Sequence, residues 1–156
     1  MKYKRLSQEE LQALEKEFVS YLASAQITAS DWQRMKIKEP EKANELIDVF
    51  SDVVYDKVLR KIKFLEFREQ KVLNIFHFEE QKIVLIGLKA NEVSTIDLTS
   101  SDPQKQLDQT DLKGIKIFKT EKEYIKEREE EIFELLQNGC LVTNERLFNL
   151  LSDMAK

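Results

Sequence analysis

Two strings near the middle of the chain decide its fold class: VLNIFHFE (residues 72–79) and KIVLIGLK (residues 82–89), separated by Glu80 and Gln81. Alternate residues of the first string form two sets, which are Leu73, Ile75 and His77, and Asn74, Phe76 and Phe78. A period of two residues is typical of a strand. The second string contains the run Ile83–Leu88, which is apolar on both sides and indicates a buried central strand. Together they predict an antiparallel pair of strands.

The flanking sequence extends this sheet in both directions. Further strands are predicted at Lys63–Arg68, Val93–Leu98 and Gly114–Lys119, which gives a central antiparallel sheet of about four to five strands. Helical periodicity is confined to the N-terminal residues and to two C-terminal segments. Because helices and strands do not alternate, the predicted class is α+β rather than a doubly wound sheet.

The N-terminal part is predicted to be helical. Ser7 and Glu10 form a capping box for a helix that reaches Ala25, and Ser30 caps a short helix. Pro40 begins the longest helix, which ends near Ile62. Its broad apolar surface places Phe50 in the core, and we expect the sheet to pack against this helix.

The remaining segments complete the expected chain. The polar stretch Thr99–Leu112 is predicted to be a flexible loop. A helix is predicted from Glu121 to Asn138, with Ile125 on its apolar stripe, and a final helix is capped by Thr143.

Composition favours one domain that covers residues 1–156. The net charge is −4, from 25 Lys and Arg against 29 Asp and Glu, and such a balance names no partner. Cys140 is the only cysteine, so no intrachain disulfide is possible. No apolar stretch follows the basic residues near the N-terminus, so we expect no secretory signal, and the longest apolar run is too short to span a bilayer. These features predict a cytoplasmic protein that does not contact membranes.

The sequence contains no known phosphate-binding, dinucleotide-binding, zinc-binding or nucleophile-elbow motif. His77 and Cys140 are the side chains best suited to proton transfer or nucleophilic attack, but they lie in different predicted elements. We expect them to be far apart and to serve packing or surface roles. The sequence therefore predicts no catalytic residue, no cofactor and no metal.

Three carboxylates repeat every four residues along the longest helix: Asp48, Asp52 and Asp56. With a facing carboxylate, such a ladder could bind Mg²⁺. The favoured interpretation is a solvated helix face opposite Phe50.

Two features are candidate interaction sites. Trp32 stands in a short polar helix, where it either anchors a partner or fills the seam between two helices, and the seam is favoured. A basic cluster at the end of the longest helix could grip phosphate or an acidic partner, although cations also stabilise a helix C-terminus. The members of the basic cluster are Lys57, Arg60, Lys61 and Lys63.

Several strings together resemble a family of short, uncharacterised bacterial proteins that is known only as a domain of unknown function. The strings are Met1–Ser7 with Glu9-Glu10-Leu11, Asp31-Trp32, Phe50-Ser51-Asp52, Leu65-Glu66 and Arg128–Phe133. The resemblance covers nearly the whole chain and implies a bacterial cytoplasmic protein that stands alone as a domain. It carries over no active site.

The preferred function is therefore a non-catalytic protein-interaction or regulatory protein of the bacterial cytoplasm. A small enzyme that uses His77 and acidic residues is one alternative. A nucleic-acid- or ribosome-associated protein that uses the cluster Lys57–Lys63 is the other, although nucleic acid is disfavoured as a partner by the charge balance. The expected partner is a protein of unknown identity, and homo-oligomerisation is left open.

Overall fold

The computed structural model describes residues 1–109 and 112–156, so part of the predicted loop Thr99–Leu112 lies outside the described residues. The order of elements is helices, then strands, then strands mixed with helices, which confirms the α+β class. The elements are α1 (Gln8–Ala13), α2 (Glu15–Ser24), α3 (Ala29–Lys38), α4 (Pro40–Lys61), β1 (Phe64–Glu69), β2 (Val72–Phe78), β3 (Lys82–Ala90), α5 (Pro103–Gln109), β4 (Ile115–Glu123), α6 (Arg128–Gln137), β5 (Leu141–Thr143) and α7 (Glu145–Met154). The chain divides into two compact units, Met1–Leu59 and Arg60–Lys156.

The first unit consists of α1, α2, α3 and most of α4. The predicted capping box is present, since Ser7 Oγ accepts a hydrogen bond from the Glu10 N–H at 3.1 Å and the Glu10 carboxylate accepts one from the Ser7 N–H at 2.9 Å. The predicted first helix is interrupted at Leu14, which separates α1 from α2. The cap of α3 is Thr28 rather than Ser30, because Thr28 forms a second capping box with Asp31.

Aromatic rings surround the buried Phe50 in the first unit. Phe50 on α4 is 3% exposed, and its ring centroid lies 5.0 Å from that of Phe18 and 5.4 Å from that of Tyr21. The predicted burial of Phe50 is therefore confirmed. Its ring partners Phe18 and Tyr21 come from α2. The expected packing of the sheet against α4 concerns both units and stays a prediction.

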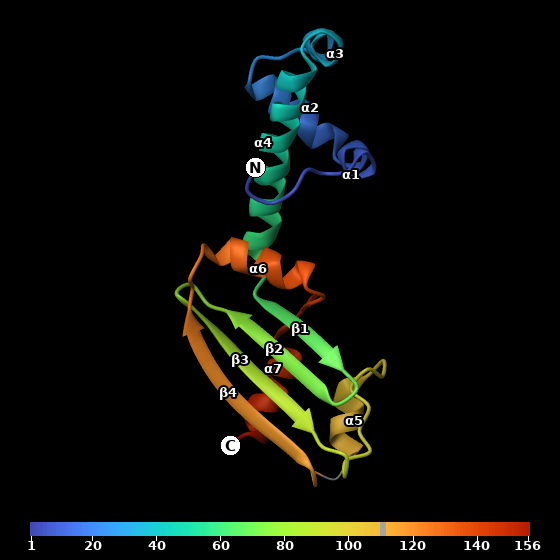
Figure 1. Cartoon of the computed structure of the whole chain (residues 1–156), viewed down its shortest axis with the longest axis vertical. Coiled ribbons are helices and arrows are strands. Elements are labelled where there is room, and N and C mark those ends of the chain that lie inside the picture. The colour runs from blue at the N-terminus through green and yellow to red at the C-terminus, as the bar shows by residue number, and fades with distance from the viewer. Residues whose placement is uncertain (110–111) are drawn as a thin grey trace. The chain divides into compact units, whose positions relative to one another are not determined.

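The second unit is built on an antiparallel sheet with strand order β4-β3-β2-β1-β5 (Figure 1). The two deciding strings form the predicted pair β2 and β3, in which Ile75 lies opposite Ile86. The predicted sheet of about four to five strands is thus confirmed as a sheet of five.

Two helices contact this sheet from different sides. In Figure 1, α7 lies behind the strands, and α6 lies across their upper end at the front. Leu147 and Leu151 of α7 belong to the largest buried cluster. On the α6 side, Ile132 is fully buried, and the Arg128 guanidinium donates to the backbone carbonyls of Ile62 and Phe78.

Two predictions between β3 and β4 are wrong. Val93–Leu98 forms no strand, although Ile96 and Leu98 are buried in the core. This segment makes its hydrogen bonds elsewhere: Lys71 Nζ donates to the carbonyls of Ser94 and Ile96 at 2.5 and 3.0 Å. The predicted loop contains the helix α5, whose Leu107 is 4% exposed within the core cluster and whose Pro103 is also buried, so apolar side chains anchor a polar segment. The flexibility expected of this segment stays a prediction.

The C-terminal boundaries also differ from the prediction. The segment Glu121–Asn138 is not one helix, because β4 continues to Glu123 opposite Lys82 and α6 begins only at Arg128. Ile125, expected on the buried stripe, lies between the two elements and is 86% exposed. The three residues of β5 were too few to give a pattern. Asn144 caps α7 in place of Thr143.

Candidate functional site

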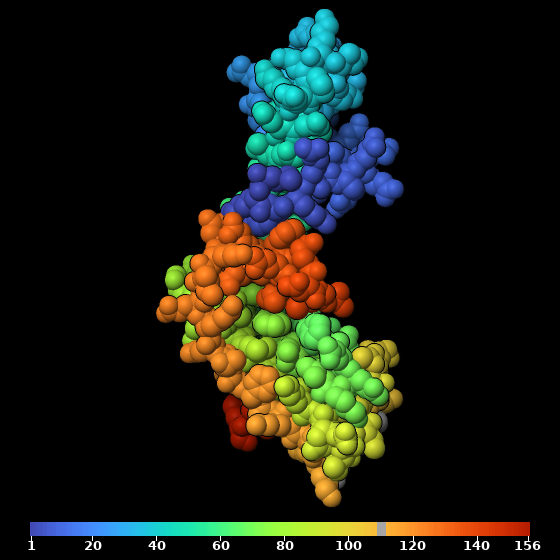
Figure 2. Space-filling view, viewed as in Figure 1, coloured from blue at the N-terminus to red at the C-terminus, as the bar shows by residue number. Residues whose placement is uncertain are grey.

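The second unit presents two different sheet faces, because alternate residues of each strand point to opposite sides. The covered face carries Leu73, Ile75, Ile86 and Leu88, which are fully buried beneath α7. The opposite face is covered by α6 only at its upper end. Below α6, the side chains of β1 to β4 form the visible surface in Figure 2. We call this uncovered part the open face.

The strand register arranges the open face in three rows of cross-strand neighbours. The first row contains Glu69, Val72, Lys89 and Lys116; the second contains Phe67, Asn74, Gly87 and Phe118; the third contains Leu65, Phe76, Leu85 and Thr120. The large apolar side chains of the second row and most of those of the third are half-buried, which means that parts of their surfaces face solvent. The open face is therefore apolar in its centre.

The second row depends on a glycine. A Cβ atom at Gly87 would lie 2.3 Å from the ring of Phe118 and 2.7 Å from Asn74 Oδ1. The absence of a side chain thus allows the Phe118 ring to lie over β3, a use of glycine that is common where another group approaches a strand closely. Asn74 Oδ1 is buried beside this ring without a hydrogen-bond partner, which costs free energy.

The third row borders a small cavity of about 180 Å³ near α6. Its lining residues are Phe76, Ile83, Leu85, Thr120, Glu121 and Lys122. Beyond this row, Phe78 and Ile83 are 3% exposed, so the open face ends where the sheet becomes buried. The apolar centre therefore continues into a shallow depression that can accept an apolar side chain.

The first row places two positive charges at the end of the open face that is farthest from α6. Lys89 on β3 lies directly opposite Lys116 on β4, and both side chains are exposed. Like charges in this position repel one another. Within the described residues, neither ammonium group is paired with a carboxylate.

His77 lies on the covered side of β2 and is engaged in packing. Its ring is stacked on Phe64, with centroids 4.4 Å apart and planes 9° apart, and Phe148 contacts it edge-on at 5.3 Å. Burial lowers the pKa of His77, while Glu79, whose Oε1 lies 3.9 Å from Nδ1, acts in the opposite direction. The imidazole is thus a neutral, stacked ring near pH 7.

Cys140 is a free, buried cysteine that immediately precedes β5. Burial raises the pKa of its thiol, so the thiolate that nucleophilic chemistry requires is disfavoured. That His77 and Cys140 lie far apart stays a prediction.

The carboxylate ladder has a role that neither of its predicted interpretations included. Asp52 accepts hydrogen bonds from the backbone N–H groups of Lys2 and Tyr3 at 2.7 and 3.0 Å, and Asp56 accepts one from the Tyr3 hydroxyl at 2.5 Å. Asp48 pairs with Arg5 at 2.5 Å. The ladder therefore fixes the N-terminal segment against α4, and it is not simply a solvated face.

Trp32 occupies the favoured seam position. It is half-buried, and its ring meets that of Phe18 at 5.1 Å and 80°, which joins α3 to α2. Lys36 Nζ lies 6.0 Å from the Trp32 ring. The basic cluster is exposed throughout, and an interaction role for its members stays a prediction: Lys57, Arg60, Lys61 and Lys63.

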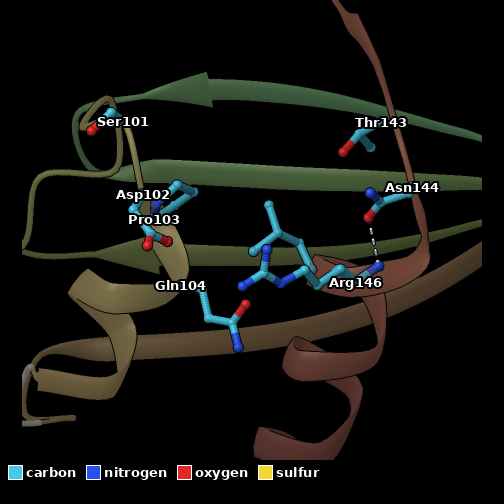
Figure 3. Close-up of a pocket in the computed structure, with 8 residues that line it drawn as sticks. Ser101, Asp102, Pro103, Gln104, Thr143, Asn144 and Arg146 are labelled. Carbon is cyan, nitrogen blue, oxygen red and sulfur yellow. Dashed lines mark hydrogen bonds between the residues drawn. The ribbon is translucent and has the colours of Figure 1, made fainter.

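A second cavity of about 330 Å³ lies between α5 and the start of α7 (Figure 3). The Asn144 side chain caps α7 by accepting from the Arg146 N–H at 3.0 Å, and the Arg146 side chain extends toward Gln104. Asp102 is engaged with the N–H of Lys105 at 3.1 Å. The other lining residues are Ser101, Pro103, Thr143 and Leu147, so the lining is mixed in polarity.

In the part of the chain that the structure describes, no three His, Cys, Asp or Glu residues are grouped to hold a metal ion. Among the same residues, no helix combines the length and apolar character of a membrane span. The sequence reasoning missed the open face. The sequence pattern that indicates this face is the alternation of Lys116, Phe118 and Thr120. A lysine next to an aromatic residue on one side of a strand is not typical of a fully buried sheet face.

A family model described as a family of unknown function, DUF6495, matches residues 1–156. The chain belongs to this family. The expected membership in a family of unknown function, matched over nearly the whole chain, is thereby confirmed. No curated protein and no solved structure matches the chain.

Proposed function

We propose that this DUF6495 protein is a non-catalytic interaction protein that docks a partner protein on its open face. The observation that carries the proposal is an antiparallel sheet whose uncovered face is apolar in its centre. Antiparallel sheets that face water on one side normally alternate apolar and polar residues, so that the solvent-facing side is polar. Here the solvent-facing side carries Phe67, Phe76 and Phe118.

Contiguous apolar surface of this kind marks interaction sites on soluble proteins. Aromatic residues are also enriched where binding energy is concentrated. The cavity beside Phe76 and Leu85 adds a recess for one partner side chain. Together these features support a docked protein in preference to a small-molecule substrate, which would be enclosed more fully.

The state of the reactive side chains supports a non-catalytic role. The His77 ring is packed between Phe64 and Phe148, and burial raises the pKa of the Cys140 thiol, which disfavours the thiolate that a nucleophile requires. The free, buried thiol suits a reducing compartment. A bacterial cytoplasmic location is part of this proposal, and fractionation of the native cell tests it.

The docking role is tested with full-length tagged protein in its native cell. Phe76→Ser and Phe118→Ser each remove one ring from the open face, and Ile125→Ser removes an exposed apolar residue outside it. We expect the unmodified chain and the Ile125 variant to migrate in the same complex on native gels. Both phenylalanine variants should migrate as the free protein while keeping a cooperative thermal transition. Equal migration of all four proteins would refute docking on the open face.

A further inference from the structure

We infer that the partner on the open face presents an acidic, amphipathic segment whose carboxylates lie over Lys89 and Lys116. This inference rests on the proposed docking function and adds the chemistry of the docked segment. The two lysines repel one another across β3 and β4, and no contact within the described residues compensates for this repulsion.

Lys89 and Lys116 are direct cross-strand neighbours in the register of β3 and β4. Opposite charges at such positions stabilise a sheet, and like charges destabilise it. Both ammonium groups are exposed, and no carboxylate of the described residues is paired with either. A pair of carboxylates brought by a partner would convert this repulsion into two charge-assisted contacts.

Protection of a sheet edge does not account for the pair. Lysines on edge strands prevent unwanted pairing with other chains, and this reason applies to Lys116, because β4 is an edge strand. It does not apply to Lys89, because β3 is paired on both sides, with β2 and with β4. The second lysine therefore requires a different reason, and recognition of negative charge supplies one.

The charge lies next to the apolar rows, which defines the pattern of the partner. Residues two apart on a strand are separated by about 6.8 Å, so the Phe118 row lies about 7 Å from the lysines and the Phe76 row about 14 Å. A helix rises about 6 Å in four residues. A partner helix that runs along the strands would carry acidic residues at one end, followed by large apolar residues about four and eight positions later.

A protein segment fits this face better than a nucleic acid does. The open face offers two unpaired lysines, while the first turn of α6, at its other end, carries Glu129, Glu130 and Glu131. A phosphate backbone that crossed the face would approach these carboxylates. A short acidic segment joined to an apolar one meets the lysines without extending to these carboxylates.

The test uses site-specific photo-crosslinking of the full-length protein in its native cell. p-Benzoylphenylalanine is incorporated at Thr120, an exposed position in the third row, and at Ile125 as the control site outside the open face. We expect the Thr120 probe to give a protein adduct that the Ile125 probe does not give. Peptide mapping of the adduct should locate the crosslink within a segment that has the acidic and apolar spacing described above.

Charge reversal then tests the lysines. The double variant Lys89→Glu/Lys116→Glu keeps two like charges opposite each other, so the fold retains the same repulsion and its stability should not change. The adduct yield should fall about tenfold, which corresponds to about 1.4 kcal/mol of binding free energy. The matched double variant Lys105→Glu/Lys119→Glu changes the net charge equally through exposed lysines outside the open face, and it should leave the yield unchanged.

A failure of this inference can be distinguished from a failure of the proposed function. A protein adduct whose segment is not acidic, or whose yield ignores the charge reversal, overturns the inference and keeps docking on the open face. An adduct with the mass of two copies of this chain supports the inference only if the crosslinked segment is acidic and sensitive to the reversal, and otherwise overturns it. A nuclease-sensitive adduct overturns both, as does the absence of any adduct specific to Thr120.

Discussion

The covered face and the open face of the sheet are made by the same strands, yet they have different surroundings. On β3, Ile86 and Leu88 are fully buried in the cluster that α7 closes, whereas their neighbour Leu85 is half-buried on the opposite face, which α6 covers only at its upper end (Figure 1). The centres of both faces are apolar. The difference is that α7 covers the centre of one face, whereas α6 covers only the upper end of the other (Figure 1).

An apolar strand sequence alone does not distinguish a core from an interaction surface. A strand that is apolar on both sides predicts burial on both sides, but it does not specify whether the second cover is part of the same chain. The carboxylate ladder gives the complementary case, in which a polar helix face is covered by the chain's own N-terminal segment. A core is therefore distinguished from an interaction surface by whether another part of the same chain covers it, rather than by its composition.

The largest expected effect compares two leucines on β3. Leu88→Ala should lower the free energy of unfolding by about 2–5 kcal/mol, because it leaves a cavity beneath α7. Leu85→Ala should cost only about 1 kcal/mol, because solvent already reaches this side chain. Urea denaturation of both variants measures the difference. Equal losses would show that the open face is packed as a core in the isolated protein.

A smaller effect is expected at Gly87, where the open face is most tightly assembled. Gly87→Ala introduces a Cβ atom 2.3 Å from the Phe118 ring, and displacement of this ring should cost about 1–2 kcal/mol. In a Phe118→Ala background, the same change should cost less, because its main obstacle is gone. A double-mutant cycle by chemical denaturation measures this coupling. Additive effects of the two substitutions would mean that the ring does not lie over Gly87.

The pH dependence of stability tests the packing of His77 on the covered side. Burial holds its pKa below the ordinary value of 6.5, although Glu79 partly compensates. The unfolded chain therefore binds a proton more readily than the folded chain does as the pH falls below that value. Stability should be complete above the unfolded pKa and should decrease as the pH falls below it.

The variant His77→Phe keeps a ring against Phe64 and removes the titration. Its free energy of unfolding, measured from about pH 7 to pH 5, should decrease less steeply than that of the unmodified chain. Parallel curves for the two proteins would show that the imidazole titrates alike in both states, as it would on a solvated surface.

The sequence predicted those parts of the fold that have a strong local signal. The alternation in β2, the capping box at Ser7 and the helix start at Pro40 are properties of a few neighbouring residues, and each is present. The errors lie where distant residues decide the structure. β4 extends through charged residues because β3 supplies its partner up to Lys82, and β5 forms because β1 offers a free edge.

The candidate site could be predicted only in part, for the same reason. The apolar rows were visible as alternation, but no local pattern places Phe67 and Phe118 in one row or Lys89 opposite Lys116. That placement depends on the register of three strand pairs. The ladder of Asp48, Asp52 and Asp56 was recognised as a pattern, but its partners lie more than forty residues away, in the N-terminal segment.

The smallest expected effect distinguishes stability from binding on the open face. Lys116→Glu places a carboxylate directly opposite Lys89 and replaces repulsion with attraction, which should stabilise the fold by about 0.2–1 kcal/mol. The gain should decrease in high salt, because exposed charges are screened. Thermal and urea denaturation at low and high salt measure both effects.

The same variant should weaken the complex in the native cell, because one of the two cations that meet the acidic segment has been reversed. A substitution that strengthens the fold and weakens binding would show that the lysine pair is kept for its partner, as expected where function opposes stability. If Lys116→Glu destabilises the fold, or if it stabilises the fold and leaves the complex intact, then the pair serves the sheet itself and the open face has no need of an acidic partner.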